Sequence, residues 1–396
     1  MSVYPDTAVR RAMKIQEIIL RAMSGEITWI KAAQIIGVSD RTMRRWKLRY
    51  QKYGYDGLFD RRRQRPSPKR APYEEVERIL RLYREVYMGF NVRHFHQIAS
   101  EKHGVGLSYS FVKKALQEAG LVPRRKSRGR HRKRREPRPC FGELVHIDGS
   151  DHAWLSLVPE EKQTLIALQD DATGKILYAQ LWPEETTKAI MTALWQMVST
   201  YGICISLYSD RAGWAFHTPK AGGKVDRQNL TQVGVALNKL GIEHIPSYSP
   251  QGRGRGERLN RTLQDRLVNE LRVAGATDMA TANEYLNQTF IPDFNRRFGR
   301  EPKDPESAFV GCNGTDLNQI FCIEEERVVN KDNTISYKNK ILQLEPQPNR
   351  RTCAGLHVLV RHHLDGGYSI WKGPHLLGVY NAEGQGVKKQ TKKKAA

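Results

Sequence analysis

Leu144-Val145-His146-Ile147-Asp148 is an apolar run of strand length that ends in a carboxylate. A short apolar run with β-branched residues is typical of a buried strand. Residues 205–210 repeat this pattern and end in Asp210, and Glu257 opens a helical pattern after a loop rich in Gly and Arg. Two acids on strands and a third at the start of a helix can meet around a pair of hard divalent cations. The stretch therefore predicts a metal-dependent site on a sheet.

The composition favours a polyanionic partner. The chain has 396 residues, of which 39% are hydrophobic, and a net charge of +23. This length suits about two to four domains with folded cores. So much positive charge favours a polyanion, such as double-stranded DNA, that releases counterions on binding. No apolar run of about eighteen residues and no secretory signal pattern is present, so we expect no membrane partner and a cytoplasmic protein.

Two basic segments divide the chain. Residues 61–70 are basic and contain two prolines, and ten of the fifteen residues in 124–138 are Lys or Arg. Like charges repel, so the second segment is expected to stay extended until phosphates neutralise it, although a plain solvated spacer is an alternative. We expect a helix-turn-helix domain in 1–60, a basic linker in 61–71, a second helix-turn-helix-like domain in 72–123, a basic linker in 124–139, an RNase H-like catalytic core in 140–305, a small all-β barrel in 320–384 and a basic tail in 385–396.

The first domain has the spacing of a helix-turn-helix unit. Apolar residues recur at helical spacing from Ala12 to Ala22, and a second helix is predicted in 27–36. Gly37 allows a tight turn, after which Ser39 or Asp40 caps a third helix whose basic face fits a major groove. A helical bundle with a charged face is the alternative.

The second domain repeats this plan less clearly. Helices are predicted around 76–86, in 92–102 and in 108–119, with Gly104 between the last two. Four residues of the third helix are predicted to point inward: Phe111, Val112, Ala115 and Leu116. A helical hairpin that only packs on its neighbours would show the same pattern. The histidines at 94, 96 and 103 lack matching cysteines, and the five cysteines of the chain are scattered, so we predict reduced thiols and no zinc site.

After residue 138 strands and helices alternate. Strands are predicted at 144–148, 164–169 and 175–182, the last two joined by a hairpin, followed by a helix in 186–201. A strand in 203–209, a helix in 229–240, a strand in 242–246 and a helix in 257–273 complete the pattern. This is the order of an RNase H-like mixed sheet. From residue 321 the chain is rich in short strands, which predicts the small β-barrel.

The chemistry of the three acids suits Mg²⁺. In-line phosphodiester cleavage needs an activated water or 3′-hydroxyl and a stabilised leaving oxygen, and two divalent ions can provide both. Glu257 lies at a helix N-terminus, which favours its ionised form, and its face differs from the leucine stripe at 259, 263, 267 and 271. We therefore expect Asp148, Asp210 and Glu257 to be the catalytic and metal-binding residues.

Other acids compete for these roles. Asp151 follows Asp148 by three residues and could replace it. Asp170 and Asp171 lie at a predicted hairpin, where turn chemistry explains them. Asp226 and Asp265 are more simply a cap and a solvated helix position. Tyr368 with the basic residues at 361–363 faintly suggests a tyrosine recombinase, but the remaining basic residues of such a site are not recognisable.

These motifs resemble those of a known family. His146-Ile147-Asp148, Tyr208-Ser209-Asp210-Arg211 and the block from Ser249 to Asp265 are similar to the three signatures of retroviral-integrase-like DDE transposases from bacterial insertion sequences. The resemblance covers residues 140–300 well. It implies two Mg²⁺ ions on the three acids, replaceable by Mn²⁺, and a role for Asn260 in supporting the site or contacting DNA. The segment between Asp210 and Glu257 is longer than in many members, and Arg211-Ala212 replaces a frequent Asn-Gly.

Basic residues near these motifs are candidates for DNA contact. They lie on the third helix, on the helix in 108–119, in the second linker and around Glu257. The set is Arg41, Arg44, Arg45, Lys47, Lys113, Lys114, Arg124, Arg125, Arg128, Arg130, Arg132, Arg253, Arg255, Arg258, Asn260 and Arg261.

The sequence therefore predicts a transposase that binds its terminal inverted repeats and joins them to target DNA after 3′-end cleavage. The resemblance implies a homo-oligomer, at least a dimer on paired ends, in a bacterial, nucleoid-associated setting. A DNA-binding regulator would explain the helix-turn-helix units and leave the acids without a role. An RNase H-like nuclease without strand transfer would explain the acids and leave the sequence-reading domains without a role.

Overall fold

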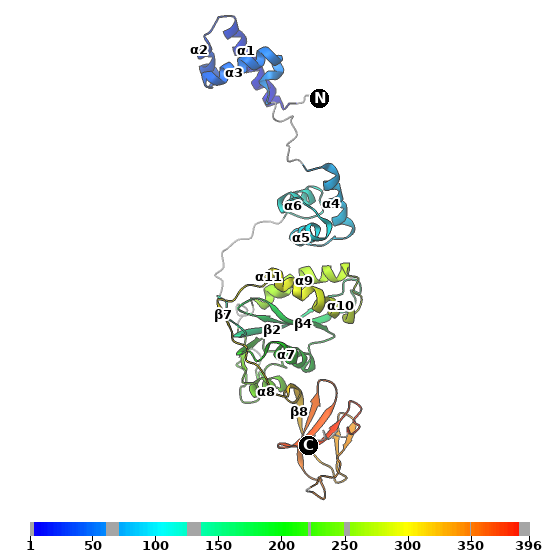
Figure 1. Cartoon of the computed structure of the whole chain (residues 1–396). Coiled ribbons are helices and arrows are strands. Elements are labelled where there is room, and N and C mark those ends of the chain that lie inside the picture. The colour runs from blue at the N-terminus through cyan, green and yellow to red at the C-terminus, as the bar shows by residue number, and fades with distance from the viewer. Residues whose placement is uncertain are drawn as a thin grey trace, which may run out of the picture. The chain divides into compact units, whose positions relative to one another are not determined.

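The structure is a computed structural model that describes residues 4–60, 71–124, 136–220, 223–248, 254–348 and 350–387. Contacts divide the chain into two compact units, Met1–Arg78 and Ile79–Ala396 (Figure 1). Most of both predicted linkers and of the basic tail lies outside the described residues. No described helix is both long enough and apolar enough to cross a membrane.

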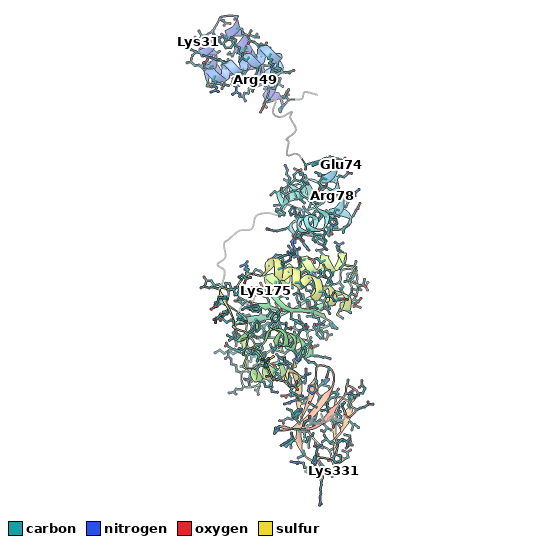
Figure 2. The ribbon with its side chains drawn as sticks, in the orientation of Figure 1. Lys31, Arg49, Glu74, Arg78, Lys175 and Lys331 are labelled. Carbon is teal, nitrogen blue, oxygen red and sulfur yellow. The ribbon has the colours of Figure 1, made fainter. Side chains whose placement is uncertain are left out.

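The first unit contains the predicted helix-turn-helix. It consists of α1 (Asp6–Met23), α2 (Trp29–Ile36), α3 (Asp40–Tyr53) and the short η1 (Gly54–Leu58). The apolar positions of α1 are buried as expected, and Thr28 and Ser39 cap α2 and α3. Gly37 ends α2 at φ 73°, a left-handed conformation that favours glycine. Basic side chains such as Lys31 and Arg49 stand on the surface of this unit (Figure 2).

A second group of three helices follows. It consists of α4 (Tyr73–Glu85), which spans the division between the units, α5 (Val92–His103) and α6 (Tyr109–Glu118). Val112 and Leu116 are buried, but the prediction that Phe111 points inward is wrong, because its ring is 37% exposed. One residue along a helix is a rotation of about 100°, so a neighbour of Val112 leaves the buried stripe.

A five-stranded mixed sheet forms the centre of the second unit. Its strands are β2 (Leu144–His152), β3 (Gln163–Asp170), β4 (Ile176–Trp182), β5 (Ser206–Ser209) and β6 (Glu243–Pro246), in the spatial order β4-β3-β2-β5-β6. The first three pair antiparallel, whereas β5 and β6 run parallel to β2. This arrangement is the one expected for an RNase H-like core. The strand β2 extends past Asp148, which therefore lies within the strand and not at its end.

Helices cover both faces of the sheet (Figure 1). On one face α7 (Thr187–Tyr201) and α8 (Gln232–Lys239) pack on Val145, Ile147 and Leu207. On the other, α9 (Gly256–Val273), α10 (Met279–Tyr285), the π-helical η3 (Leu286–Phe290) and α11 (Ile291–Phe298) pack on β3 and β4. The predicted helix in 229–240 begins later than expected because Thr231 caps it. The short strands β1 (Cys140–Phe141) and β7 (Asp304–Ser307) pair beside the sheet.

The C-terminal part is all-β after a short helix, α12 (Leu317–Ile320). The strands β8 (Cys322–Val328), β11 (His357–His363), β12 (Tyr368–Lys372) and β13 (His375–Tyr380) form an antiparallel sheet, and β9 (Thr334–Tyr337) and β10 (Lys340–Gln343) form a separate hairpin. A shared core joins them. The predicted barrel is not found, because the strands of the described residues do not close into one sheet.

We expect Leu263→Ala to destabilise the protein by about 2–5 kcal/mol, because Leu263 is fully buried between α9 and the sheet. Urea unfolding followed by tryptophan fluorescence tests this, since Trp154 belongs to the same cluster. The control Arg261→Ala changes an exposed residue of the same helix, and its effect should stay within about 0.5 kcal/mol. Equal effects of the two changes would contradict the burial of the stripe.

Candidate active site

Strand pairing places two of the predicted acids on one face of the sheet. In the parallel pair of β2 and β5, His146 lies opposite Tyr208, and their rings are 5.2 Å apart. Side chains alternate between faces, and Asp148 and Asp210 each follow this pair by two residues. Continued past the end of β5 at Ser209, the register therefore puts Asp210 level with Asp148 on the same side. The neighbouring Val145, Ile147 and Leu207 belong to the core on the opposite face.

The first turns of α9 lie against Asp148. A Cβ atom on Gly256 would come within 3.0 Å of Asp148 Oδ2, so the helix backbone approaches this carboxylate closely. Asn260, one turn later, donates from Nδ2 to the same oxygen at 2.8 Å. In the next turn Gln264 donates to Ser150 Oγ at 3.1 Å. Glu257 follows Gly256 directly and is exposed, so it stands beside the face that contacts Asp148.

A fourth carboxylate, which sequence reasoning missed, adjoins these acids. Glu185 lies so close to Gly149 that a Cβ atom there would be 2.7 Å from Glu185 Oε1, and Trp214 donates to that oxygen at 2.9 Å. Partial desolvation raises the pKa of Glu185, whereas the hydrogen bond from Trp214 lowers it. The charges of Asp210, Asp148 and Asp151 raise this pKa further. In the sequence, the only signal that could have pointed to Glu185 is its position just before the helix α7 and its cap, Thr186.

A buried ionic group links β2 to the start of α9. The Asp171 carboxylate is fully buried, 2.8 Å from His146 Nε2 and 2.9 Å from Arg255 Nε. It also accepts from the Arg138 backbone N–H at 2.7 Å. Burial alone would raise the pKa of Asp171, but the His146 hydrogen bond, the Arg138 N–H and the Arg255 charge together lower it to about 2.

The competing acids have other partners. Asp151 pairs with Thr164 across to β3 and, at an odd spacing from Asp148, points to the other face. Asp170 accepts from the backbone of Gly142 and from Thr173, which organises the β3–β4 turn. Asp226 accepts from backbone N–H groups of its own loop, and Asp265 from Asn91.

The predicted DNA-binding residues lie on several surfaces. Arg41, Arg44 and Arg45 are exposed on α3, where Lys47 packs over the Trp29 ring at 4.6 Å. On α6 and just after it, Lys113, Lys114 and Arg124 are exposed, as are Arg258 and Arg261 at the start of α9. Arg255 and Asn260 instead make the contacts with Asp171 and Asp148 given above. Five candidates lie outside the described residues: Arg125, Arg128, Arg130, Arg132 and Arg253.

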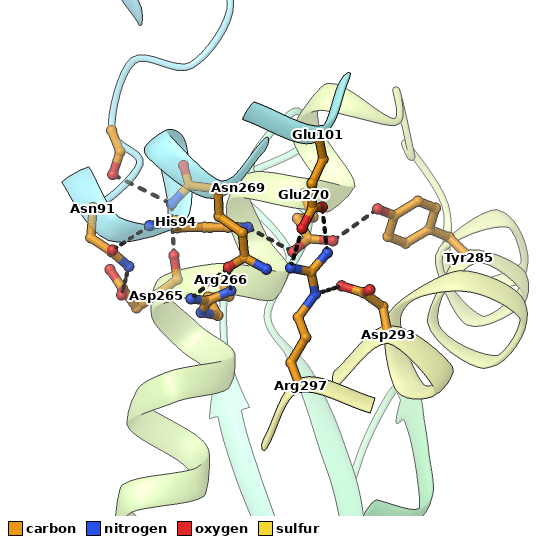
Figure 3. A network of polar contacts seen from close by, with 12 residues as sticks. Asn91, His94, Glu101, Asp265, Arg266, Asn269, Glu270, Tyr285, Asp293 and Arg297 are labelled. Carbon is orange, nitrogen blue, oxygen red and sulfur yellow. Dashed lines mark hydrogen bonds and ion pairs between the residues drawn. The ribbon is translucent and has the colours of Figure 1, made fainter. Parts of the chain in front are cut away.

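The later turns of α9 contact the second helical group (Figure 3). His94 of α5 is buried, and its Nε2 lies 2.8 Å from Glu270 Oε1 on α9. Tyr285 donates to the other oxygen of Glu270 at 2.9 Å. Arg297 of α11 forms a two-pronged contact with Glu101 of α5, at 2.8 and 2.6 Å. The helix that begins beside Asp148 is thus held along its length.

Within the described residues no three His, Cys, Asp or Glu side chains are grouped closely enough to form a metal site as they stand. Asp148 and Asp210 share a face, whereas Glu257 is not gathered with them. The segment just before Gly254, residues 249–253, lies outside the described residues.

Comparisons with known proteins agree with this architecture. A helix-turn-helix domain model matches residues 16–67, and a homeodomain-like domain model matches residues 42–116. "Putative transposase y4bF" of Sinorhizobium fredii is 31% identical over 363 residues, which cover 91% of this chain and 79% of that protein. The transposase for insertion sequence IS1202 of Streptococcus pneumoniae is 31% identical over 360 residues, which cover 82% of this chain and 76% of that protein.

Solved structures give weaker matches. The simian T-cell lymphotropic virus intasome covers 77% of this chain and 96% of the matched chain, with 11% identity and a TM-score of 0.33. The HTLV-2 integrase catalytic core domain was solved in complex with magnesium. Its match covers 38% of this chain and 88% of the matched chain, with 16% identity and a TM-score of 0.28. At these TM-scores, the fold assignment depends on strand order and register.

Helix-turn-helix domains, a strongly basic chain and a mixed sheet with two antiparallel and two parallel strand pairings are features of DNA-recombining proteins. Two relatives above 30% identity, most of whose length this chain covers, define the family. The chain belongs to the transposases of insertion sequences.

The depressed pKa of Asp171 predicts a pH-dependent contribution to stability. Its folded value of about 2 lies below the unfolded value of about 3.9, so the stabilisation is present above about pH 4 and is lost as the pH falls through about 2. The shift corresponds to about 2–3 kcal/mol. In urea titrations, the gap in unfolding free energy between wild type and Asp171→Asn should therefore narrow from pH 6 to pH 2. A gap that stays constant over this range would contradict the assignment.

The contact between α5 and α11 predicts a measurable coupling. We expect a double-mutant cycle of Glu101→Ala and Arg297→Ala to give a coupling energy of about 0.5–2 kcal/mol, because the pair is two-pronged and the arginine is largely buried. The exposed pair of Lys114 and Glu118, 3.6 Å apart on α6, is the control and should give less than about 0.5 kcal/mol. Equal couplings would show that the contact between the helical group and the core is not formed in solution.

Proposed function

We propose that this transposase binds the terminal inverted repeats of its element and uses Asp148, Asp210 and Glu257 to cut the 3′ ends and join them to target DNA. The observation that carries the proposal is the register of β2 and β5, which brings Asp148 level with Asp210 beside the start of α9. The exposed basic faces of α3 and α6 are proposed to read the repeats.

The donor set fits divalent metal ions. Asp148, Asp210 and the neighbouring Glu185 offer carboxylate oxygens, the ligands that Mg²⁺ prefers, and Glu257 adds another at the adjoining helix start. Burial is the main cause of the raised pKa of Glu185, and the neighbouring negative charges add to it; bound cations would relieve this repulsion. We propose that Asp148, Asp210 and Glu257 hold two Mg²⁺ ions, for which Mn²⁺ can substitute. Such ions, when bound, lower the pKa of a water or hydroxyl and stabilise the leaving oxygen.

The protein's own groups orient these acids. Asn260 holds one oxygen of Asp148 at 2.8 Å, and the Ala212 backbone N–H holds Oδ1 of Asp210 at 3.0 Å. Arg258 and Arg261, exposed beside Glu257, are placed to contact phosphates of the bound strand. Water attacks first and releases a 3′-hydroxyl. That hydroxyl then attacks the target phosphodiester in line, so no covalent protein intermediate is needed.

Joining two ends requires two bound ends at once. We therefore propose that the active form is at least a dimer assembled on paired ends. The inverted repeats are identical sites, so a symmetric assembly of identical chains is the simplest way to hold them.

The experiment that tests the proposal is a joining assay with labelled DNA ends from the borders of the element and a target plasmid. Asp148→Asn, Asp210→Asn and Glu257→Gln should each lower joining in Mg²⁺ by about 100-fold or more, because each removes a charge opposite the reacting phosphate. A mobility-shift assay should show that all three variants still bind the ends. Asp151→Asn is the matched control, since its side chain points to the other face of β2, and it should retain most of the joining activity.

Three outcomes would contradict the proposal in different ways. Wild-type joining by all three variants would remove the catalytic assignment. Binding of the ends without metal-dependent nicking would favour a DNA-binding regulator. Cut products that are never joined would favour a nuclease.

A further inference from the structure

Most helices in the described part of the chain begin with a side-chain cap, but α9 does not. Thr186, Thr231 and Asp278 accept from backbone N–H groups at the starts of α7, α8 and α10. Among the described residues no side-chain hydrogen bond of this kind is found at Arg255, which precedes α9. A helix start without a side-chain cap frays more easily than a capped one. Yet this start carries Glu257 and approaches Asp148.

Arg255 provides the missing attachment by another route. Its side chain is only 13% exposed, its Nε lies 2.9 Å from Asp171 Oδ1, and its Nη1 donates to the Asp171 backbone oxygen at 2.9 Å. A planar guanidinium can engage two oxygens of one residue together, whereas a lysine offers a single point charge. The start of α9 is therefore attached to the β3–β4 turn.

Asp171 extends the attachment to β2. Its carboxylate also contacts His146 Nε2 at 2.8 Å, and His146 precedes Asp148 by two residues. A chain of buried contacts thus runs from the residue before α9 to the strand that carries the first acid. Leaving a buried charge in such a group without its partner is strongly destabilising, so the contacts are expected to hold together.

We propose that Arg255 is a positioning residue that, through Asp171 and His146, holds the start of α9 against β2 so that Glu257 and Asn260 stay beside Asp148. This differs from the sequence prediction that Arg255 contacts DNA phosphate. It depends on the proposed function, because Glu257 is there taken as a metal ligand.

The test compares Arg255→Lys and Arg255→Gln with Arg261→Gln, an exposed arginine of the same helix. For each variant we would measure the salt dependence of DNA binding and the Mg²⁺ concentration that gives half-maximal joining at saturating DNA. Both Arg255 variants should raise the Mg²⁺ requirement several-fold and leave the slope of log Kd against log salt unchanged. Arg261→Gln should lower that slope by about 1, as expected for one lost phosphate contact. Asp171→Asn should behave like Arg255→Gln, and the double variant should be no worse than either single one.

A second readout needs neither metal nor DNA. Hydrogen exchange at residues 256–261 should be faster in Arg255→Lys than in wild type, while exchange in α7 stays the same. Arg255→Lys keeps the positive charge and is the variant to use if Arg255→Gln fails to fold. If Arg255→Gln lowered the salt slope as Arg261→Gln does, with unchanged exchange and Mg²⁺ requirement, Arg255 would be a phosphate contact and the proposal would be overturned. If wild type itself joined no DNA, the proposed function would fail, whereas the exchange measurement would still decide the role of Arg255.

Discussion

Side chains alternate along a strand, and the parallel pairing of β2 with β5 places His146 opposite Tyr208. Everything proposed about the site depends on this register. A shift of one residue would turn Asp148 toward α7 and bury it among the apolar side chains of the core, where a carboxylate is strongly disfavoured. The apolar residues Val145, Ile147 and Leu207 hold the register, because their burial on the α7 face requires the acids to point to the α9 face.

The helix α9 then brings a second element to that face, and different forces hold its two parts. Its leucine stripe packs on β3 and β4, and its later turns contact α5 through His94 and Glu270. Its first residues lack a side-chain cap and are attached through Arg255 to a buried carboxylate. Hydrophobic packing is tolerant in direction, whereas an ion pair with a planar guanidinium constrains position and orientation. The part of the helix nearest the acids therefore depends on a directional polar contact in place of a side-chain cap.

Much of the core could be predicted because its signals are local. The strand from Leu144, the stripe from Leu259 to Leu271 and the turn at Gly37 each follow from spacing within a few residues. The errors have local causes too. Phe111 was assigned to the buried face, but it lies one residue before Val112 and therefore outside the buried stripe. Glu185 gave no comparable signal, since its proximity to Asp148 and Asp210 arises only when the segment after β4 folds back on Gly149.

The sequence by itself determined most of the elements and the basic character of the chain, and it predicted Asp148, Asp210 and Glu257 as candidate metal ligands, because each of these depends on residue type and short-range periodicity. Only the tertiary structure decided which acids share a face and what Arg255 contacts. In the sequence Arg255 is one of several arginines in a glycine-rich loop, and its partner Asp171 is 84 positions away. The ion pair of Arg255 and Asp171 becomes buried, and its geometry becomes fixed, only after the sheet and α9 have packed together. The role of Arg255 therefore depends on the path of the chain.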